Sequence, residues 1–480
     1  MTPVLTIPWG QADWNAVLPL SIVALTPLLV IAADLILSRS LRRGACIAIA
    51  AFGLIVGGIV AALSWGHPYP AFGGGFVSGG FAIVFEEVIV AGALFSLLLA
   101  AHLGRDDQAG GGIALLLWSA SGAMLMAGAA NLMTIFLGLE LLSLSLYCLC
   151  GLAARPTARE AALKYLILSS AASGFMLYGM ALLFGATGSV QLAAFAAPPA
   201  SPALFALGSG LFLIGLVFKL SLAPFHAWTP DVYEGAPLPI TAFMSVVTKA
   251  GALAVLARFA YAALPQHNAQ AILLPLWIVA AISMLVGNLG ALAQTDVKRL
   301  LAYSGIAQLG YVVTALAGTT ALGLRYAIFY LVAYTFMNLG AFAVVALLSH
   351  EHEEGSQLQS YAGLGYRQPA LAALMTFFLL GLAGLPPTAG FTGKLLILAS
   401  SVDAGYGWLA VIMIVGTGIS AYAYLKIVRA MYARGAGAAL QRHVRPASLW
   451  PWLGVAVCAA GVLVLAFYPL APSDVLPLVK

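Results

Sequence analysis

The sequence consists largely of apolar runs about twenty residues long, separated by short segments that hold most of its charges. A bilayer core about 30 Å thick is crossed by about 20 apolar helical residues, so each run is long enough for one membrane-spanning helix. The candidate spans are 17–37, 45–63, 83–103, 112–130, 131–152, 161–186, 203–223, 238–263, 271–293, 298–318, 323–349, 369–400, 408–433 and 449–472. We therefore expect an all-α polytopic membrane protein with about fourteen transmembrane helices.

The composition excludes the common soluble classes. Of the 480 residues, 62% are hydrophobic and only 8% are charged, whereas about a quarter of a soluble domain is charged. No phosphate-binding loop and no glycine-rich dinucleotide motif occurs. The four cysteines, Cys46, Cys148, Cys150 and Cys458, have no C-x-x-C spacing, so we expect buried thiols and no disulfide or metal site. The chain is expected to hold no cofactor and to bind no nucleic acid.

The distribution of basic residues predicts the orientation of the helices. If the N-terminus lies outside, alternate loops facing the cytoplasm carry most of the 21 lysines and arginines, as the positive-inside rule requires. These basic residues are Arg39, Arg42, Arg43, Arg105, Arg155, Arg159, Lys298, Arg299, Arg367, Arg429, Arg434, Arg442 and Arg445. Opposite loops such as 64–82 and 187–202 contain none. Both termini are therefore expected on the periplasmic side.

A weak internal repeat relates the two halves of the chain. Residues 163–179 match residues 324–340 at a constant offset of 161 residues. The offset covers an odd number of predicted helices, so the two copies should have opposite orientations in the membrane; chance similarity between apolar helices is the alternative. We predict N-terminal helices in 1–111, a first five-helix repeat in 112–263, a second, inverted repeat in 271–433 and a C-terminal helix in 449–480.

Each predicted repeat contains an interrupted helix. The span 203–223 runs into Pro224 and the polar segment 225–230, and the span 369–400 is interrupted by Gly-Leu-Pro-Pro-Thr-Ala-Gly at 384–390. Proline removes a backbone donor, and unpaired backbone groups are tolerated at membrane depth only inside protein or along a water-filled cavity. Interrupted helices at corresponding places in two repeats indicate an ion pathway.

Four ionisable residues lie within predicted spans, namely Glu140, Lys219, Lys249 and Lys394. Each costs about 2.5–3.5 kcal/mol at the centre of a membrane helix, so each needs a partner or a function. A static buried ion pair is one interpretation, but one acid cannot neutralise three bases. A buried lysine can exchange a proton, because desolvation disfavours its charged form, and a nearby carboxylate would control that exchange. We predict these four residues as a proton-translocation site.

Two further residues are candidates for the same pathway. Lys164 lies near the end of its span, where it could extend to the lipid headgroups or take part in proton transfer. His226 lies in the first interruption, and an unperturbed histidine titrates near neutral pH, so it could deliver protons; an exposed loop histidine is the alternative. The neighbouring Asp231 and Glu234 could order water at the same place.

The sequence around the first interruption resembles a known signature. Residues 219–237, Lys-Leu-Ser-Leu-Ala-Pro-Phe-His-Ala-Trp-Thr-Pro-Asp-Val-Tyr-Glu-Gly-Ala-Pro, resemble the broken helix of the antiporter-like subunits of respiratory complex I, and are most similar to the subunit N branch. The resemblance extends over nearly the whole chain. It implies that Glu140 and Lys219 form the pair of the first half-channel, that Lys249 follows them, and that Lys394 serves the second repeat. Lys164 matches a lysine on the family's sixth helix.

The resemblance also implies a function. A subunit of this kind translocates protons within NADH:quinone oxidoreductase of the bacterial inner (plasma) membrane, coupled to redox chemistry elsewhere in the complex. FMN, iron–sulfur clusters, NADH and quinone would be held by partner subunits, and the neighbours would be other complex I membrane subunits, including homologous antiporter-like subunits, and lipid. Two alternatives remain at this point. One is a subunit of a cation/proton antiporter complex with the same signature, and the other is a structural subunit that pumps nothing.

Overall fold

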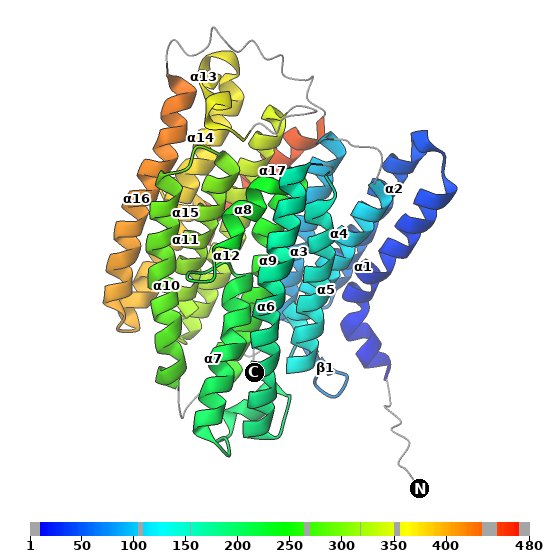
Figure 1. Ribbon diagram of the computed structural model, residues 1–480, viewed down its shortest axis with the longest axis vertical. Coiled ribbons are helices and arrows are strands. Elements are labelled where there is room, and N and C mark those ends of the chain that lie inside the picture. Colours follow the sequence, from blue (N-terminus) through cyan, green and yellow to red (C-terminus); the bar gives the residue numbers. More distant parts are fainter. Residues whose placement is uncertain are drawn as a thin grey trace.

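The computed structural model describes residues 10–103, 109–153, 155–263, 269–316, 318–349, 356–433 and 449–469. These residues form a bundle of roughly aligned helices (Figure 1). The helices are α1 (Gln11–Ile36), α2 (Arg39–Leu63), α3 (Gly80–Leu103), α4 (Ala109–Gly128), α5 (Leu132–Gly151), α6 (Pro156–Thr187), α7 (Pro202–Lys219), α8 (Trp228–Gly235), α9 (Leu238–Arg258), α10 (Ala269–Leu292), α11 (Val297–Leu316), α12 (Ala321–Leu348), α13 (Leu364–Arg367), α14 (Pro369–Ala383), α15 (Ala389–Asp403), α16 (Gly407–Tyr432) and α17 (Leu449–Phe467). Short 3₁₀ helices η1 (Leu192–Ala196) and η3 (Leu358–Tyr361), a π-helical turn η2 (Phe259–Ala263) and strands β1 (Tyr69–Ala71) and β2 (Phe76–Ser78) complete the fold.

Twelve helices of the described residues are long and apolar enough to cross a membrane. They are α1 to α7, α9, α10, α12, α16 and α17. The prediction of an all-α polytopic membrane protein is confirmed, whereas the count of about fourteen is not confirmed by these criteria, which leave out α11 and the interrupted pair α14 and α15. Both termini, together with Arg105, Arg434, Arg442 and Arg445, lie outside the described residues, so the orientation in the membrane stays a prediction.

The centre of the bundle is formed by α9 and α12. Every residue of α9 is buried, and α9 packs against α3, α4 and α12. Helices α1 and α2 lie at one side of the bundle and α16 at the opposite side (Figure 1). The outer faces remain apolar: Leu163, Ile167, Phe175 and Tyr178 of α6 are all exposed. Lipid tails accept such a surface, because they are as apolar as the side chains themselves.

A small β-hairpin covers one end of α1 and α4. Strands β1 and β2 are antiparallel, with Ala71 opposite Phe76. The Asp13 carboxylate of α1 accepts a hydrogen bond from the Phe72 backbone N–H at 2.8 Å. Phe76 packs so closely on Gly128 that a Cβ there would lie 2.3 Å from its ring. The sequence predicts only an external loop for this segment, because a three-residue strand is too short to show an alternating pattern.

The two repeats share their helix packing and a distinctive backbone connection. The pairs α4–α5, α5–α6 and α4–α9 of the first repeat correspond to α10–α11, α11–α12 and α10–α16 of the second. At the start of α5, the Leu132 N–H donates to the Val190 carbonyl at 2.9 Å; at the start of α11, the Val297 N–H donates to the Ser356 carbonyl at 2.6 Å. A 3₁₀ helix follows the acceptor segment in both cases.

The repeats are inverted relative to each other. Helix α5 begins beside the segment that follows the end of α6, as the Leu132 contact shows. Helix α11 begins beside α8, and α8 is held by Lys164 near the start of α6. Since α6 has 32 residues and is therefore about 48 Å long, the two starts lie at opposite ends of the bundle. The residue limits 1–111, 112–263, 271–433 and 449–480 remain predictions.

Candidate functional site

Both predicted interruptions are present. The first lies between the end of α7 at Lys219 and the start of α8 at Trp228, and the second between Ala383 and Ala389. Near the start of each interruption, one residue has a left-handed backbone conformation. These residues are Ser221, with φ 61°, and Gly384, with φ 80°. A left-handed residue cannot continue an α-helix, so each helix ends there.

Backbone groups released at the first interruption find partners in the protein. The Ala223 N–H donates to Ser283 Oγ of α10 at 2.8 Å, and Ala223 is fully buried. The Trp228 indole N–H donates to the Phe218 carbonyl at 3.1 Å. An unpaired backbone group is costly at membrane depth, so these bonds stabilise the interrupted conformation. The Ser283 contact also means that the second repeat completes the interruption of the first.

Lys219 is held at the end of α7 by two hydroxyl groups. Its ammonium group donates to Ser143 Oγ of α5 at 2.8 Å and to the Tyr165 hydroxyl of α6 at 3.0 Å. The Lys219 side chain is 1% exposed. The Tyr165 ring stacks on Trp228 of α8, with ring centroids 4.6 Å apart. Residues from α5, α6 and α8 therefore enclose one lysine.

The other two lysines of the predicted site lie at the carbonyl ends of the interrupted helices. Lys249 of α9, which is 1% exposed, donates to Ser221 Oγ and reaches the Lys219 carbonyl at 3.5 Å. Lys394 of α15, which is 4% exposed, donates to the carbonyls of Leu382 and Ala383 at 3.0 and 3.1 Å. A cation at the C-terminus of a helix is favourable, because carbonyl groups there are unpaired and the helix dipole is negative.

In the part of the chain that the structure describes, the hydrogen-bond acceptors of these three lysines are all hydroxyl or carbonyl oxygens. No carboxylate among the described residues lies within ion-pair distance of Lys219, Lys249 or Lys394. A buried ion pair would resist proton loss, since removing the proton would leave an uncompensated carboxylate. A lysine held by hydroxyl and carbonyl groups has no such restraint, so the arrangement suits groups that bind and release protons.

The remaining predicted residues lie around the first interruption. Glu140 is half-buried one turn before Ser143 on α5 and accepts a hydrogen bond from Ser173 at 2.6 Å. It therefore lies near Lys219 but makes no ion pair with it. His226 is half-buried between α7 and α8, its ring centroid 6.5 Å from that of Tyr303. The functional roles assigned to these residues from the sequence remain predictions.

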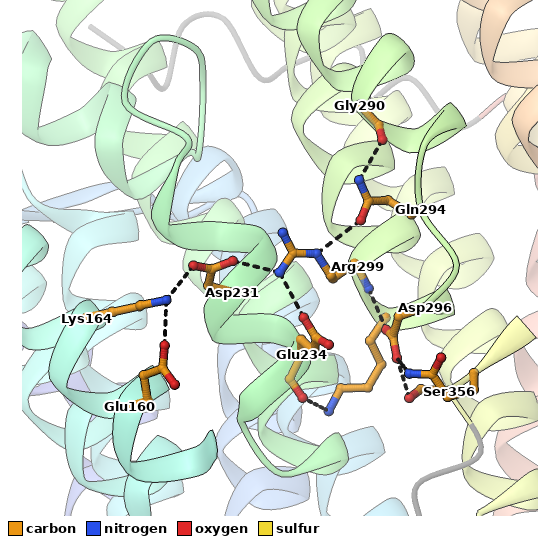
Figure 2. A network of polar contacts seen from close by, with 11 residues as sticks. Glu160, Lys164, Asp231, Glu234, Gly290, Gln294, Asp296, Arg299 and Ser356 are labelled. Atoms are coloured by element: carbon orange, nitrogen blue, oxygen red, sulfur yellow. Dashed lines mark hydrogen bonds and ion pairs between the residues drawn. The ribbon is translucent and has the colours of Figure 1, made fainter. Parts of the chain in front are cut away.

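Lys164 belongs to a chain of ion pairs at the end of the bundle where α6 begins. Figure 2 shows it between Glu160 of the same helix, at 2.8 Å, and Asp231 of α8, at 2.7 Å. The other oxygen of Asp231 accepts from Arg299 of α11 at 2.7 Å, and Arg299 also reaches Glu234 at 2.8 Å. Asp231 and Glu234 thus serve as ion-pair partners, rather than only as the water-ordering groups that the sequence suggests.

Sequence reasoning missed three polar residues inside the bundle, Glu86, Glu87 and Gln308. Glu86 and Glu87 lie within α3, and Glu86 is only 4% exposed; their presence in a predicted span could have identified them. In the second repeat, Gln308 donates to the Leu382 carbonyl at 2.9 Å, the same carbonyl that Lys394 contacts, and accepts from Tyr330. No sequence signal singles out Gln308, because uncharged polar residues that face other helices are common in membrane bundles.

The central part of the chain matches a known protein family. The model of the family described as "NADH:quinone oxidoreductase/Mrp antiporter, TM" matches residues 129–420, well over half of the chain. The chain belongs to this family. The matched segment contains the two interruptions and all six predicted site residues: Glu140, Lys164, Lys219, His226, Lys249 and Lys394.

Individual members of the NADH:quinone oxidoreductase/Mrp antiporter family are similar over their whole length. NADH-quinone oxidoreductase subunit N 1 of Symbiobacterium thermophilum is 41% identical, with 95% of this chain and 96% of the relative covered. A chain of respiratory complex I from Thermus thermophilus with bound aureothin has a TM-score of 0.82 and 37% identity, covering 96% of this chain and 98% of that chain. A chain of the Mrp complex from Dietzia sp. DQ12-45-1b shares the fold, with a TM-score of 0.79 and 20% identity. The match covers 98% of this chain and 95% of that chain. The resemblance to complex I antiporter-like subunits is confirmed.

Proposed function

We propose that this chain is a proton-translocating membrane subunit of NADH:quinone oxidoreductase. The observation that carries the proposal is the set of three buried lysines, Lys219, Lys249 and Lys394, held by neutral oxygens at two helix interruptions. Each can bind and release a proton without leaving a buried carboxylate unpaired. The similarity to subunit N relatives supports the assignment to that enzyme.

The pathway would enter through the first repeat and leave through the second. Lys219 accepts a proton beside Ser143 and Tyr165, and Glu140, which lies one helical turn from Ser143 on α5, controls the charge of Lys219. Lys249 passes the proton towards the centre of the bundle, and Lys394 releases it at the second interruption. His226 and Lys164 would serve the entry side. Because the repeats are inverted, entry and release would face opposite sides of the membrane.

The redox chemistry would take place outside this chain. FMN, iron–sulfur clusters, NADH and quinone would be bound by partner subunits, and the immediate neighbours would be other membrane subunits of the complex, including homologous antiporter-like subunits, and lipid. The protein would reside in the bacterial inner (plasma) membrane with both termini in the periplasm, as the basic residues of the loops predict.

Purification from the native membrane tests this proposal. The chain should co-purify with flavin- and cluster-containing subunits, and the preparation should reduce quinone with NADH. The fold is shared with the Mrp complex, so a subunit of a cation/proton antiporter is the second candidate. Sodium-dependent proton exchange by a preparation without flavin or NADH oxidation would favour that candidate and contradict the proposal.

A further inference from the structure

The start of α11, which belongs to the second repeat, contacts α8, which belongs to the first repeat. Lys298 donates to the carbonyls of Glu234 and Ala236 at 3.0 and 2.8 Å, at the C-terminal end of α8. Arg299 forms ion pairs with the carboxylates of Asp231 and Glu234 on the same helix (Figure 2). Two consecutive cations therefore bind both the backbone and the side chains of α8, which is the second part of the first interrupted helix.

The start of α11 is also tied to the segment that leads to the second interrupted helix. Asp296 accepts from the Arg299 backbone N–H at 2.9 Å, which caps α11. Its other oxygen accepts from Ser356 Oγ at 2.6 Å and from the Gln357 amide at 3.1 Å. Burial raises the pKa of the Asp296 carboxyl above its ordinary value, and the Ser356 hydrogen bond opposes this shift. From Gln357 the chain continues through η3 and α13 directly into α14.

On its other side, α8 is connected to the ligands of Lys219. Asp231 pairs with Lys164, and the next residue of α6 is Tyr165, whose hydroxyl binds Lys219. Three residues before Asp231, Trp228 stacks on the Tyr165 ring. The ion pair and the stack therefore join α8 to two adjacent residues of α6, so a displacement of α8 changes the surroundings of Lys219.

These ion pairs determine geometry more than stability. The side chains of Lys164, Asp231, Arg299 and Glu234 are between a quarter and a half exposed, and exposed pairs contribute little to folding. Asp231 is shared by one cation from each repeat, Lys164 and Arg299. With one oxygen on each cation, this carboxylate fixes the position of α8 between α6 and α11.

We infer that Arg299 is a positioning residue for the proton pathway: by holding Asp231 and Glu234 it lets the second repeat set the position of α8 and thereby the environment of Lys219. The inference rests on the proposed function, because it presupposes that Lys219 carries protons. The side-chain contacts of Arg299 are with Gln294, Asp231 and Glu234 and do not include Lys219, Lys249 or Lys394, so it acts on them only through α8. We call Asp296, Lys298 and Arg299 the junction, because they join α11 to α8 and to the segment before α14.

The test uses the whole complex in sealed membrane vesicles. For Arg299→Gln we expect assembly and NADH oxidation by an artificial acceptor to stay at the wild-type level, while the ratio of protons taken up to NADH oxidised with quinone falls about threefold to tenfold. A purely structural role would instead lower the amount of assembled complex and leave this ratio unchanged. Arg42→Gln is the matched control, since it removes the partly exposed Arg42–Asp34 contact at 3.7 Å between α1 and α2. It should leave the ratio unchanged.

Two further variants keep the test decisive. Asp231→Asn should also lower the ratio, and the loss in the double variant should be smaller than the two single losses combined, because both variants break the same Arg299–Asp231 ion pair. If Arg299→Gln does not assemble, Arg299→Lys decides: it keeps the charge but not the guanidinium reach to both carboxylates, so the ratio should fall about twofold. A wild-type ratio in the assembled Arg299 variants, or additive losses in the double variant, would overturn the inference.

The inference and the proposed function fail differently. If Lys219→Ala leaves proton uptake intact, the proposed function is wrong whatever Arg299→Gln does. If Lys219→Ala abolishes proton uptake while Arg299→Gln and Asp231→Asn pump normally, the proposed function stands and the positioning role of Arg299 is wrong.

Discussion

The two repeats contain the same connection at opposite ends of the bundle, but only one is charged. In the first repeat, Asn131 caps α5, and Met133 and Thr134 follow it. In the second, Asp296 caps α11, and Lys298 and Arg299 occupy the corresponding places. Their backbone hydrogen bonds correspond one to one: Leu192 to Ala130 in the first repeat and Leu358 to Thr295 in the second. The fold therefore needs only the backbone connection, and the charges of the second repeat are available for another purpose.

The interruptions differ in where their lysines come from. At the first, Lys249 reaches the end of α7 from α9, a separate helix. At the second, Lys394 belongs to α15, the continuation of the helix whose end it caps. A movement of α9 relative to α7 can separate the first lysine from its carbonyl, whereas the second lysine moves with its own interruption. The first interruption therefore depends on the packing of a separate helix, whereas the second holds its lysine within the same interrupted helix.

The largest expected effect is at Lys219. In Lys219→Ala, proton uptake by sealed vesicles should fall about a hundredfold, because the group that binds the proton is absent, while NADH oxidation by an artificial acceptor persists. Lys219→Arg should not restore uptake, since a guanidinium group stays protonated at neutral pH. Normal quinone-linked turnover and proton uptake in the assembled Lys219→Ala complex would falsify the role of the first repeat.

A smaller loss is expected at the second interruption. Lys394→Ala should lower proton uptake about tenfold, although Lys394 lies in the other repeat from Lys219, because a proton accepted by the first repeat then has no release site. The proton-to-electron ratio in sealed vesicles measures this effect. A wild-type ratio would show that release takes place elsewhere and that the two repeats do not share one pathway.

Gly384 tests how closely Lys394 is fixed. An added Cβ would lie 2.7 Å from Lys394 Cδ, and the φ of 80° disfavours any side chain. Gly384→Ala should cost about 1–2 kcal/mol in backbone strain and also displace the lysine, lowering proton uptake about threefold. Gly405→Ala is the matched control, with φ 85° and no atom within 4 Å of the added Cβ. It should lower the thermal denaturation midpoint without changing uptake; equal uptake in both variants would mean that the Lys394 position is not critical.

The smallest effect is expected at the uncharged connection. Asn131 accepts from the Thr134 N–H at 2.7 Å as the cap of α5. Asn131→Ala should cost about 1 kcal/mol, seen as a lower denaturation midpoint, with an unchanged proton-to-electron ratio. Asp296→Ala removes the corresponding cap but should also lower the ratio, because the junction loses its contact with Ser356 and Gln357. Identical ratios in the two variants would remove the functional difference between the two connections.

The sequence predicts the interruptions and the buried lysines well, because both follow from residue type. Proline and glycine in an apolar run end a helix, and a lysine in such a run is recognisable without any knowledge of its neighbours. The contact of Lys219 with Ser143 and Tyr165 could not be predicted in this way. Spacing along a chain shows which residues share a face of one helix, but not how that helix is rotated relative to its neighbours. The sequence therefore indicates Glu140 as the partner of Lys219, whereas the structure has Ser143, one helical turn further along α5, in contact with it.

The chain of ion pairs formed by Lys164, Asp231 and Arg299 also could not be predicted from residue spacing. Lys164, Asp231 and Arg299 are separated by 67 and 68 residues and lie on three helices. Each alone is consistent with a charge near a headgroup region, which is the commonest position for such residues. Only the packing of α8 between α6 and α11 brings them together, and that packing depends on where the first helix is interrupted.

The hydrogen bond from Ala223 to Ser283 bears on how such a protein could have arisen by duplication. The first repeat alone would leave this amide unpaired at membrane depth, at a cost of several kcal/mol. A gene encoding a single repeat would therefore have needed a second copy of its product, lying antiparallel, to supply the hydroxyl group. On this view the two-repeat chain is a fused antiparallel dimer, and the two halves expressed as separate polypeptides should insert together but not singly.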